Sequence, residues 1–230
     1  MNLSNVRAII FDMDGLLVDS ERLARAALVE TAGLFGIMPD PEILTRMIGL
    51  PADGSQNLLQ LRYGPNFPAE RYITEAAIAC EASVSAGELK PKAGARELLT
   101  FLDRLGLPKA LATSSARTKA MYTLAAVQMV DRFDAIVTRT DVARGKPYPD
   151  LFLRAARELG QSADQCIALE DSYNGVRAAH VAGMRVIMVP DLLPPTAEMI
   201  ELSEVIVPDL FGVLDALVNS GLNAKETTSR

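Results

Sequence analysis

Side chains able to bind a metal ion and a phosphoryl group occur at four separate points of this 230-residue chain. Carboxylates without histidine or cysteine partners form a hard oxygen site that suits Mg²⁺, and acids packed together repel one another without a cation. A hydroxyl, backbone N–H groups and a lysine opposite the metal suit a phosphoryl group. The candidate residues are, in chain order, Asp12, Asp14, Thr113, Ser114, Lys146, Glu170 and Asp171.

The spacing of the first two acids indicates a specific reaction. A carboxylate such as Asp12 can attack phosphorus and form an aspartyl-phosphate. A second carboxyl two residues later, Asp14, can protonate the leaving oxygen and then deprotonate the attacking water. These residue types therefore predict metal-assisted phosphoryl transfer through a covalent intermediate.

Each group taken alone also has a purely structural explanation. The Asp-Met-Asp-Gly segment at 12–15 is typical of a turn, and Lys146 is compatible with a solvated loop. Thr-Ser-Ser at 113–115 and Asp-Ser at 171–172 are typical of helix caps. The joint placement of all four groups at one sheet edge, predicted below, favours a site over four unrelated turns and caps.

Apolar runs precede most of these groups and predict the strands that position them. The runs are continuous rather than alternating, which indicates strands buried on both faces, as in a parallel sheet covered by helices. Amphipathic stretches at 117–127, 149–159 and 172–182 predict helices between the later strands. Because ligands bind at the carboxyl ends of such strands, we expect the four groups to converge there. The predicted strands are 6–12, 109–113, 134–138, 166–170 and 185–189.

The first crossover departs from this rhythm. From Ser20 to about Lys90 the pattern is helical throughout, with glycines and prolines separating about four helices. We therefore predict an α/β fold: a Rossmann-like parallel-sheet core with helices on both faces, formed by residues 1–18 and 91–220. An all-helical cap domain, 19–90, is inserted after the first strand. The polar segment 221–230 is expected to be a frayed tail.

Composition limits the function classes. Hydrophobic residues make up 49% of the chain and charged residues 23%, which is the balance of a globular protein. A net charge of −6 without a basic run disfavours nucleic-acid binding. Two cysteines and one histidine are too few for a disulfide framework or a four-ligand zinc site. No apolar run approaches the length of about 20 residues that spans a membrane. We expect a cytoplasmic monomer or small homo-oligomer.

Four motifs together resemble those of the haloacid dehalogenase superfamily, in particular its phosphatase and β-phosphoglucomutase-like branch with a helical cap. The motifs are Phe-Asp-Met-Asp-Gly-Leu-Leu-Val-Asp-Ser at 11–20, Thr-Ser-Ser at 113–115, Gly-Lys-Pro at 145–147 and Leu-Glu-Asp-Ser at 169–172. The resemblance covers about residues 6–215. The second aspartate, Asp14, distinguishes the chain from the dehalogenases themselves.

The resemblance implies a role for each matching residue. Asp12 would be the nucleophile and a Mg²⁺ ligand, and Asp14 the acid and base, with its carbonyl on the metal. Thr113 and the Ser114 N–H would hold phosphate oxygens. Lys146 would neutralise the phosphate and orient Asp12. Asp171 together with Glu170 would complete the metal site.

The resemblance leaves two enzyme activities open, because the core of a β-phosphoglucomutase would look the same. Mutases carry a histidine where this chain has Ala24, and an arginine in the cap loop that corresponds to 48–52, which has none here. Ungapped counting places Glu75 near their cap lysine. A mutase needs a cation for the second phosphate of its bisphosphate, so these differences favour a phosphatase acting on a small phosphorylated metabolite.

A signalling receiver domain is the alternative of another class, since it also combines an aspartate, Mg²⁺, a hydroxyl and a lysine. A receiver would be a compact module of about 120 residues with its acidic pair and its phosphorylated aspartate on different strands. The Asp12–Asp14 pair and the 19–90 insert count against it. A former enzyme that serves as a binding scaffold is a third reading, disfavoured by the intact acids, hydroxyl and lysine.

Overall fold

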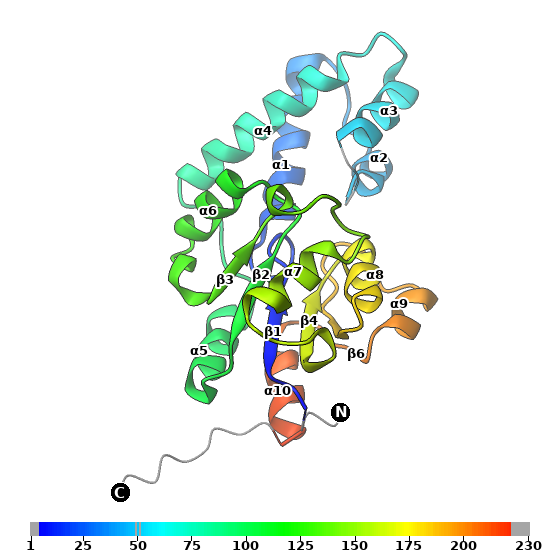
Figure 1. The fold of residues 1–230 in the computed structure, drawn as a ribbon. Coiled ribbons are helices and arrows are strands. Elements are labelled where there is room, and N and C mark those ends of the chain that lie inside the picture. The colour runs from blue at the N-terminus through cyan, green and yellow to red at the C-terminus, as the bar shows by residue number, and fades with distance from the viewer. Residues whose placement is uncertain (1–4, 49, 51, 222–230) are drawn as a thin grey trace, which may run out of the picture. The chain divides into compact units, whose positions relative to one another are not determined.

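A computed structural model describes residues 5–48, 50 and 52–221 of the chain (Figure 1). Within it the chain forms two compact units, one comprising Met1–Val18 with Pro91–Arg230 and the other Asp19–Lys90. The segment 222–230, expected to be a frayed tail, lies outside the described residues, as do Gly49 and Pro51 of the cap loop.

The first unit is built on a parallel sheet. Six strands are found in the described residues, in the order β3-β2-β1-β4-β5-β6, and every neighbouring pair is parallel. This order reverses direction between β1 and β4, where open α/β sheets bind their ligands. The strands are β1 (Ala8–Phe11), β2 (Lys109–Ala112), β3 (Ala135–Val137), β4 (Cys166–Glu170), β5 (Arg185–Met188) and β6 (Val205–Ile206).

The register of the central strands decides which residues meet at the sheet edge. Phe11 of β1 lies opposite Leu111 of β2 and Leu169 of β4. Beyond β1 the ladder continues, because the N–H of Asp12 donates to the carbonyl of Leu169 at 3.0 Å. The residues that directly follow β1, β2 and β4 therefore emerge side by side.

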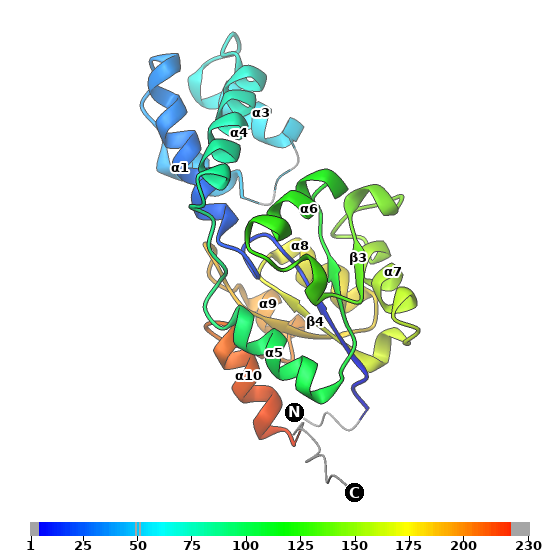
Figure 2. The same ribbon diagram turned by 90° about the vertical axis from the view of Figure 1, so that its left-hand side faces the viewer.

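Helices cover both faces of the sheet (Figure 2). On one face α7 (Asp150–Glu158), α8 (Tyr173–Val181) and α9 (Ala197–Leu202) pack on alternate strand residues such as Ile10 and Ala168. On the other face α5 (Ala95–Leu105) and α10 (Leu210–Asn219) pack against each other. Helix α6 (Arg117–Ala126) connects β2 to β3. The strands β1, β2 and β4 are buried throughout and β5 nearly so, as their continuous apolar runs predict, whereas β3 and β6 are partly buried.

The second unit is helical and has its own core. It contains α1 (Ser20–Ala32), α2 (Pro41–Arg46), α3 (Ala52–Tyr63) and α4 (Ala69–Ser85), in agreement with the four predicted helices. The long helices α1 and α4 pack together, and the hydroxyl of Tyr72 donates to the carbonyl of Leu28 at 2.6 Å. The buried apolar side chains of this unit are Ala32, Ile43, Leu59, Phe67, Ala69 and Tyr72.

The chain passes from one unit to the other at two points, after Val18 and after Lys90. Within the first unit Val18 forms an antiparallel bridge with Pro91, and the N–H of Lys92 donates to the carbonyl of Leu17 at 2.8 Å. Both ends of the insertion therefore leave the core unit at one place.

The five strands and three core helices predicted from the sequence are all present, with ends that differ by one or two residues. The sixth strand, β6, was not predicted because its two residues are too few to form a periodic pattern. None of the helices in the described residues is both long and apolar enough to cross a membrane.

Candidate active site

A buried lysine lies between two carboxylates at the centre of the sheet edge. The ammonium of Lys146 forms ion pairs with Asp12, which follows β1, and with Glu170, which ends β4; the second pair measures 2.5 Å from Nζ to Oε1. Only 5% of the Lys146 side chain is exposed, and its Nζ lies 4.9 Å from the centre of the Phe152 ring of α7. Lys146 is therefore not the solvated loop residue of the structural explanation.

The environment of these groups changes their acidity. Although burial lowers it, the carboxylates of Asp12 and Glu170 raise the pKa of Lys146 above its ordinary value. Burial raises the pKa of Asp12 to about 8, and the charge of Lys146 opposes that rise. A further positive charge beside Asp12 would lower this pKa again and favour the ionised carboxylate.

Glu170 is held on both oxygens. Its Oε1 accepts from Lys146, and its Oε2 accepts from the N–H of Ser172 at 2.9 Å and from the Ser172 hydroxyl at 3.0 Å. Ser172 is also the N-cap of α8, where its hydroxyl accepts from the N–H of Gly175. The capping prediction for this segment is thus correct, and the same residue positions a carboxylate of the site.

Asp14 is held by a residue that the sequence analysis included in a motif but did not single out. The hydroxyl of Ser115 donates to Asp14 Oδ2 at 2.8 Å, and the Ser115 N–H donates to Thr113 Oγ1 at 3.0 Å. Thr113 is buried and Ser114 is exposed. None of the three caps α6, whose N-cap is Ala116. The signal available in the sequence was the third hydroxyl of the Thr-Ser-Ser segment, two residues after Thr113.

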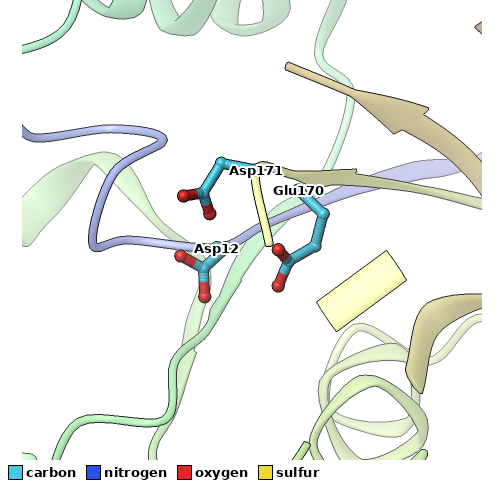
Figure 3. Close-up of side chains that lie close together, drawn as sticks. All are labelled: Asp12, Glu170 and Asp171. Atoms are coloured by element: carbon cyan, nitrogen blue, oxygen red, sulfur yellow. The ribbon is translucent and has the colours of Figure 1, made fainter. Parts of the chain in front are cut away.

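Three carboxylates converge as metal ligands would. Asp12, Glu170 and Asp171 each offer one oxygen, and these oxygens all lie within 4.8 Å of one another (Figure 3). When all three are ionised, they exceed the one ammonium of Lys146 by two negative charges. Gly15, at φ +83°, allows the close approach: a Cβ there would stand 2.3 Å from Asp171 Oδ2. Oxygen donors and excess negative charge fit a hard divalent cation.

Comparison with known proteins identifies the family. The sequence model of the haloacid dehalogenase-like hydrolases matches residues 6–183. The protein belongs to this family. Hexitol phosphatase B of Escherichia coli (strain K12) is 33% identical over 186 residues, which span 80% of this chain and 84% of that protein.

Solved structures of the same family share the fold. The chain superposes on the "putative beta-phosphoglucomutase from Thermotoga maritima" with a TM-score of 0.79 at 27% identity, over 93% of this chain and 99% of that one. For CbbY from Rhodobacter sphaeroides, in complex with phosphate, the TM-score is 0.72 at 27% identity, over 89% and 95% of the two chains.

These relationships place the chain among the enzymes of the phosphatase and phosphomutase branch of the haloacid dehalogenase-like hydrolases. They support a phosphatase- or phosphohexomutase-like activity on small phosphorylated metabolites. Membership in the family removes the receiver-domain alternative, and the inserted helical unit after β1 is foreign to a receiver as well.

Proposed function

We propose that this protein is a Mg²⁺-dependent phosphomonoesterase that acts on a small, sugar-phosphate-like metabolite through an aspartyl-phosphate on Asp12. The observation that carries the proposal is the convergence of Asp12 with Lys146, Glu170 and Asp171 at the reversal point of the sheet. When bound, Mg²⁺ would neutralise charge on the phosphoryl oxygens. Asp12 and Asp171, the backbone carbonyl of Asp14, and Glu170 are the candidate ligands.

The first half-reaction transfers the phosphoryl group to the protein. A carboxylate oxygen of Asp12 attacks phosphorus while the bond from phosphorus to the ester oxygen breaks. Asp14 donates its proton to the departing alkoxide, and its hydrogen bond from Ser115 aims the carboxyl group. Thr113, Ser114 and Lys146 hold the phosphoryl oxygens.

The second half-reaction releases phosphate. Asp14, now ionised, takes a proton from water, the water oxygen attacks phosphorus, and the bond to Asp12 breaks. Lys146 stays paired with Glu170 throughout, which keeps its ammonium beside the nucleophile. In this proposal the helical unit 19–90 is a cap that excludes bulk water and selects the substrate.

A phosphohexomutase is the second candidate, favoured by the fold shared with the Thermotoga structure. In α1 the position of the mutases' histidine is Ala24, and in α4 the carboxylate of Glu75 lies 3.8 Å from Arg71. Neither residue supplies a cation for a second phosphate, which supports phosphate-ester hydrolysis over the mutase reaction.

A phosphomonoester panel tests the proposal. With Mg²⁺ the wild type should release phosphate from several esters with many turnovers, and β-glucose 1-phosphate plus a trace of the 1,6-bisphosphate should give phosphate rather than glucose 6-phosphate. Asp12→Asn should lose turnover by about 10⁴-fold or more, because an amide is not a nucleophile. Asp131→Asn, at an exposed site, is the matched control and should keep its activity.

Two results would contradict the proposal. Normal turnover by Asp12→Asn would remove the covalent mechanism. Formation of glucose 6-phosphate that depends on the bisphosphate would establish the mutase instead.

A further inference from the structure

An acidic residue outside the predicted site reaches the same sheet edge from β5. The N–H of Val189, just past β5, donates to the carbonyl of Glu170, the last residue of β4, at 2.7 Å, so the ladder between β4 and β5 continues beyond the end of β5. Asp191 follows two residues later. The sheet therefore carries a further carboxylate to the edge that already holds Glu170 and Asp171.

One oxygen of Asp191 has a fixed partner. The ammonium of Lys92 lies 2.5 Å from Asp191 Oδ1, and only 9% of the Asp191 side chain is exposed. Lys92 is itself anchored, because its N–H donates to the carbonyl of Leu17. The ion pair sets the orientation of the Asp191 carboxylate.

The other oxygen has no partner. Asp191 Oδ2 is buried and makes no hydrogen bond to any residue that the structure describes. A buried carboxylate oxygen without a donor destabilises a protein, so such atoms require an explanation. Its surroundings supply one: the point where a Cβ on Gly15 would stand lies 3.2 Å from Asp191 Oδ2 and 2.3 Å from Asp171 Oδ2. Both carboxylates thus face the same small space beside the candidate metal ligands.

Asp191 is not placed as a direct ligand. The oxygens that lie mutually within 4.8 Å belong to Asp12, Glu170 and Asp171, and Asp191 is not among them. Mg²⁺ usually retains several of its waters, and those waters are donors that need acceptors. Substitution of a carboxylate that accepts such a hydrogen bond typically lowers the metal affinity by about 10- to 100-fold.

We infer that Asp191 is a positioning residue of the metal site, whose Oδ2 accepts a hydrogen bond from a water bound to the divalent cation while Lys92 holds its Oδ1. This inference rests on the proposed function, because it needs Mg²⁺ at the site. The inference assigns the segment after β5, together with Lys92, a part in positioning the cation.

Asp191→Asn tests the inference by replacing one oxygen with an N–H donor of the same size. Isothermal titration calorimetry with Mg²⁺ alone should show a Kd at least about 10-fold above that of the wild type. In EDTA the variant should stay folded, because the amide oxygen of asparagine can still accept a hydrogen bond from Lys92, and its melting temperature measures the loss of that ion pair separately from the Mg²⁺ affinity. Asp103→Asn removes a different ion-paired aspartate, the partner of Lys109 at the opposite sheet edge, and should leave the Mg²⁺ affinity unchanged.

The outcomes are distinguishable. A Kd within two-fold of the wild type would overturn the inference and leave the proposed function standing, and a lower melting temperature in EDTA with that Kd would assign Asp191 to the Lys92 ion pair alone. Failure of the wild type itself to bind Mg²⁺ would overturn both.

Discussion

The chemistry at the scale of single residues depends on how completely each charged group is held. Glu170 has both oxygens occupied, by Lys146 on one side and by Ser172 on the other. Asp12 has one ammonium and a burial that raises its pKa. This arrangement fits a division of roles in which Glu170 positions Lys146, while Asp12 remains available to a cation and a substrate.

Asp14→Asn should separate the two half-reactions. Asp12 can still attack an activated ester whose leaving group needs no proton, but water then lacks its base, so the aspartyl-phosphate should accumulate. Labelling with an activated ³²P-phosphomonoester should approach one equivalent per chain. Asp12→Asn is the control and should take up no label, whereas turnover of Asp14→Asn at the wild-type rate would exclude Asp14 as the base.

At the scale of elements, helix α8 packs unusually close to the end of β4. The point where a Cβ on Gly175 would stand is 1.7 Å from Glu170 Oε1 and 2.2 Å from Oε2. Real Cβ atoms do not approach other atoms so closely. The Glu170 carboxylate therefore packs directly against the backbone of Gly175 in the first turn of α8. The glycine thereby keeps the Glu170 carboxylate within reach of Lys146.

Gly175→Ala should displace the Glu170 carboxylate and weaken its pair with Lys146. We expect the free energy of unfolding to fall by about 1–3 kcal/mol, the usual cost of overpacking, and kcat/KM to fall by about 100-fold. Urea unfolding and steady-state kinetics measure the two effects. Gly33→Ala is the matched control, since a Cβ there meets nothing within 4 Å and the φ of −60° suits alanine. Unchanged kcat/KM in Gly175→Ala would show that Glu170 does not position Lys146.

At the scale of the whole molecule, the site depends on charge brought together from distant parts of the chain. Asp12 and Asp171 are 159 positions apart (171 − 12) and offer oxygens within 4.8 Å of each other. When these two acids and Glu170 are ionised, the three carboxylates and Lys146 together carry a net charge of −2 in a largely buried place. Folding thus produces a local excess of negative charge that a bound divalent cation would neutralise.

Removal of the cation should therefore stop the reaction without unfolding the protein. EDTA should reduce phosphate release below detection, and excess Mg²⁺ should restore it, because the remaining ammonium cannot offset the charges of the carboxylates and a phosphate ester together. Circular dichroism in EDTA should retain the helical signal. Full activity in EDTA would exclude a metal-dependent mechanism.

The sequence by itself determined the family and most of the elements, but not β6 or the helices α5, α9 and α10. Continuous apolar runs mark β1, β2, β4 and β5 because strands buried on both faces leave few polar positions, and local helix signals mark the 19–90 segment. Most of the candidate residues end these runs or follow them directly, and Lys146 lies in the connection after β3, so the parallel sheet was enough to predict that they share an edge.

Only the tertiary structure decided how the groups at that edge hold one another. The family resemblance implied that Lys146 orients Asp12. Sequence spacing contains no sign that the same ammonium pairs with Glu170, that Ser115 holds Asp14, or that Asp191 faces the space beside Gly15. These contacts depend on strand register and on helices that pack across the sheet, which sum over long-range interactions. A local sequence pattern indicates which face of a helix or strand is buried. The side chains that pack on this face depend on the arrangement of all elements in the fold.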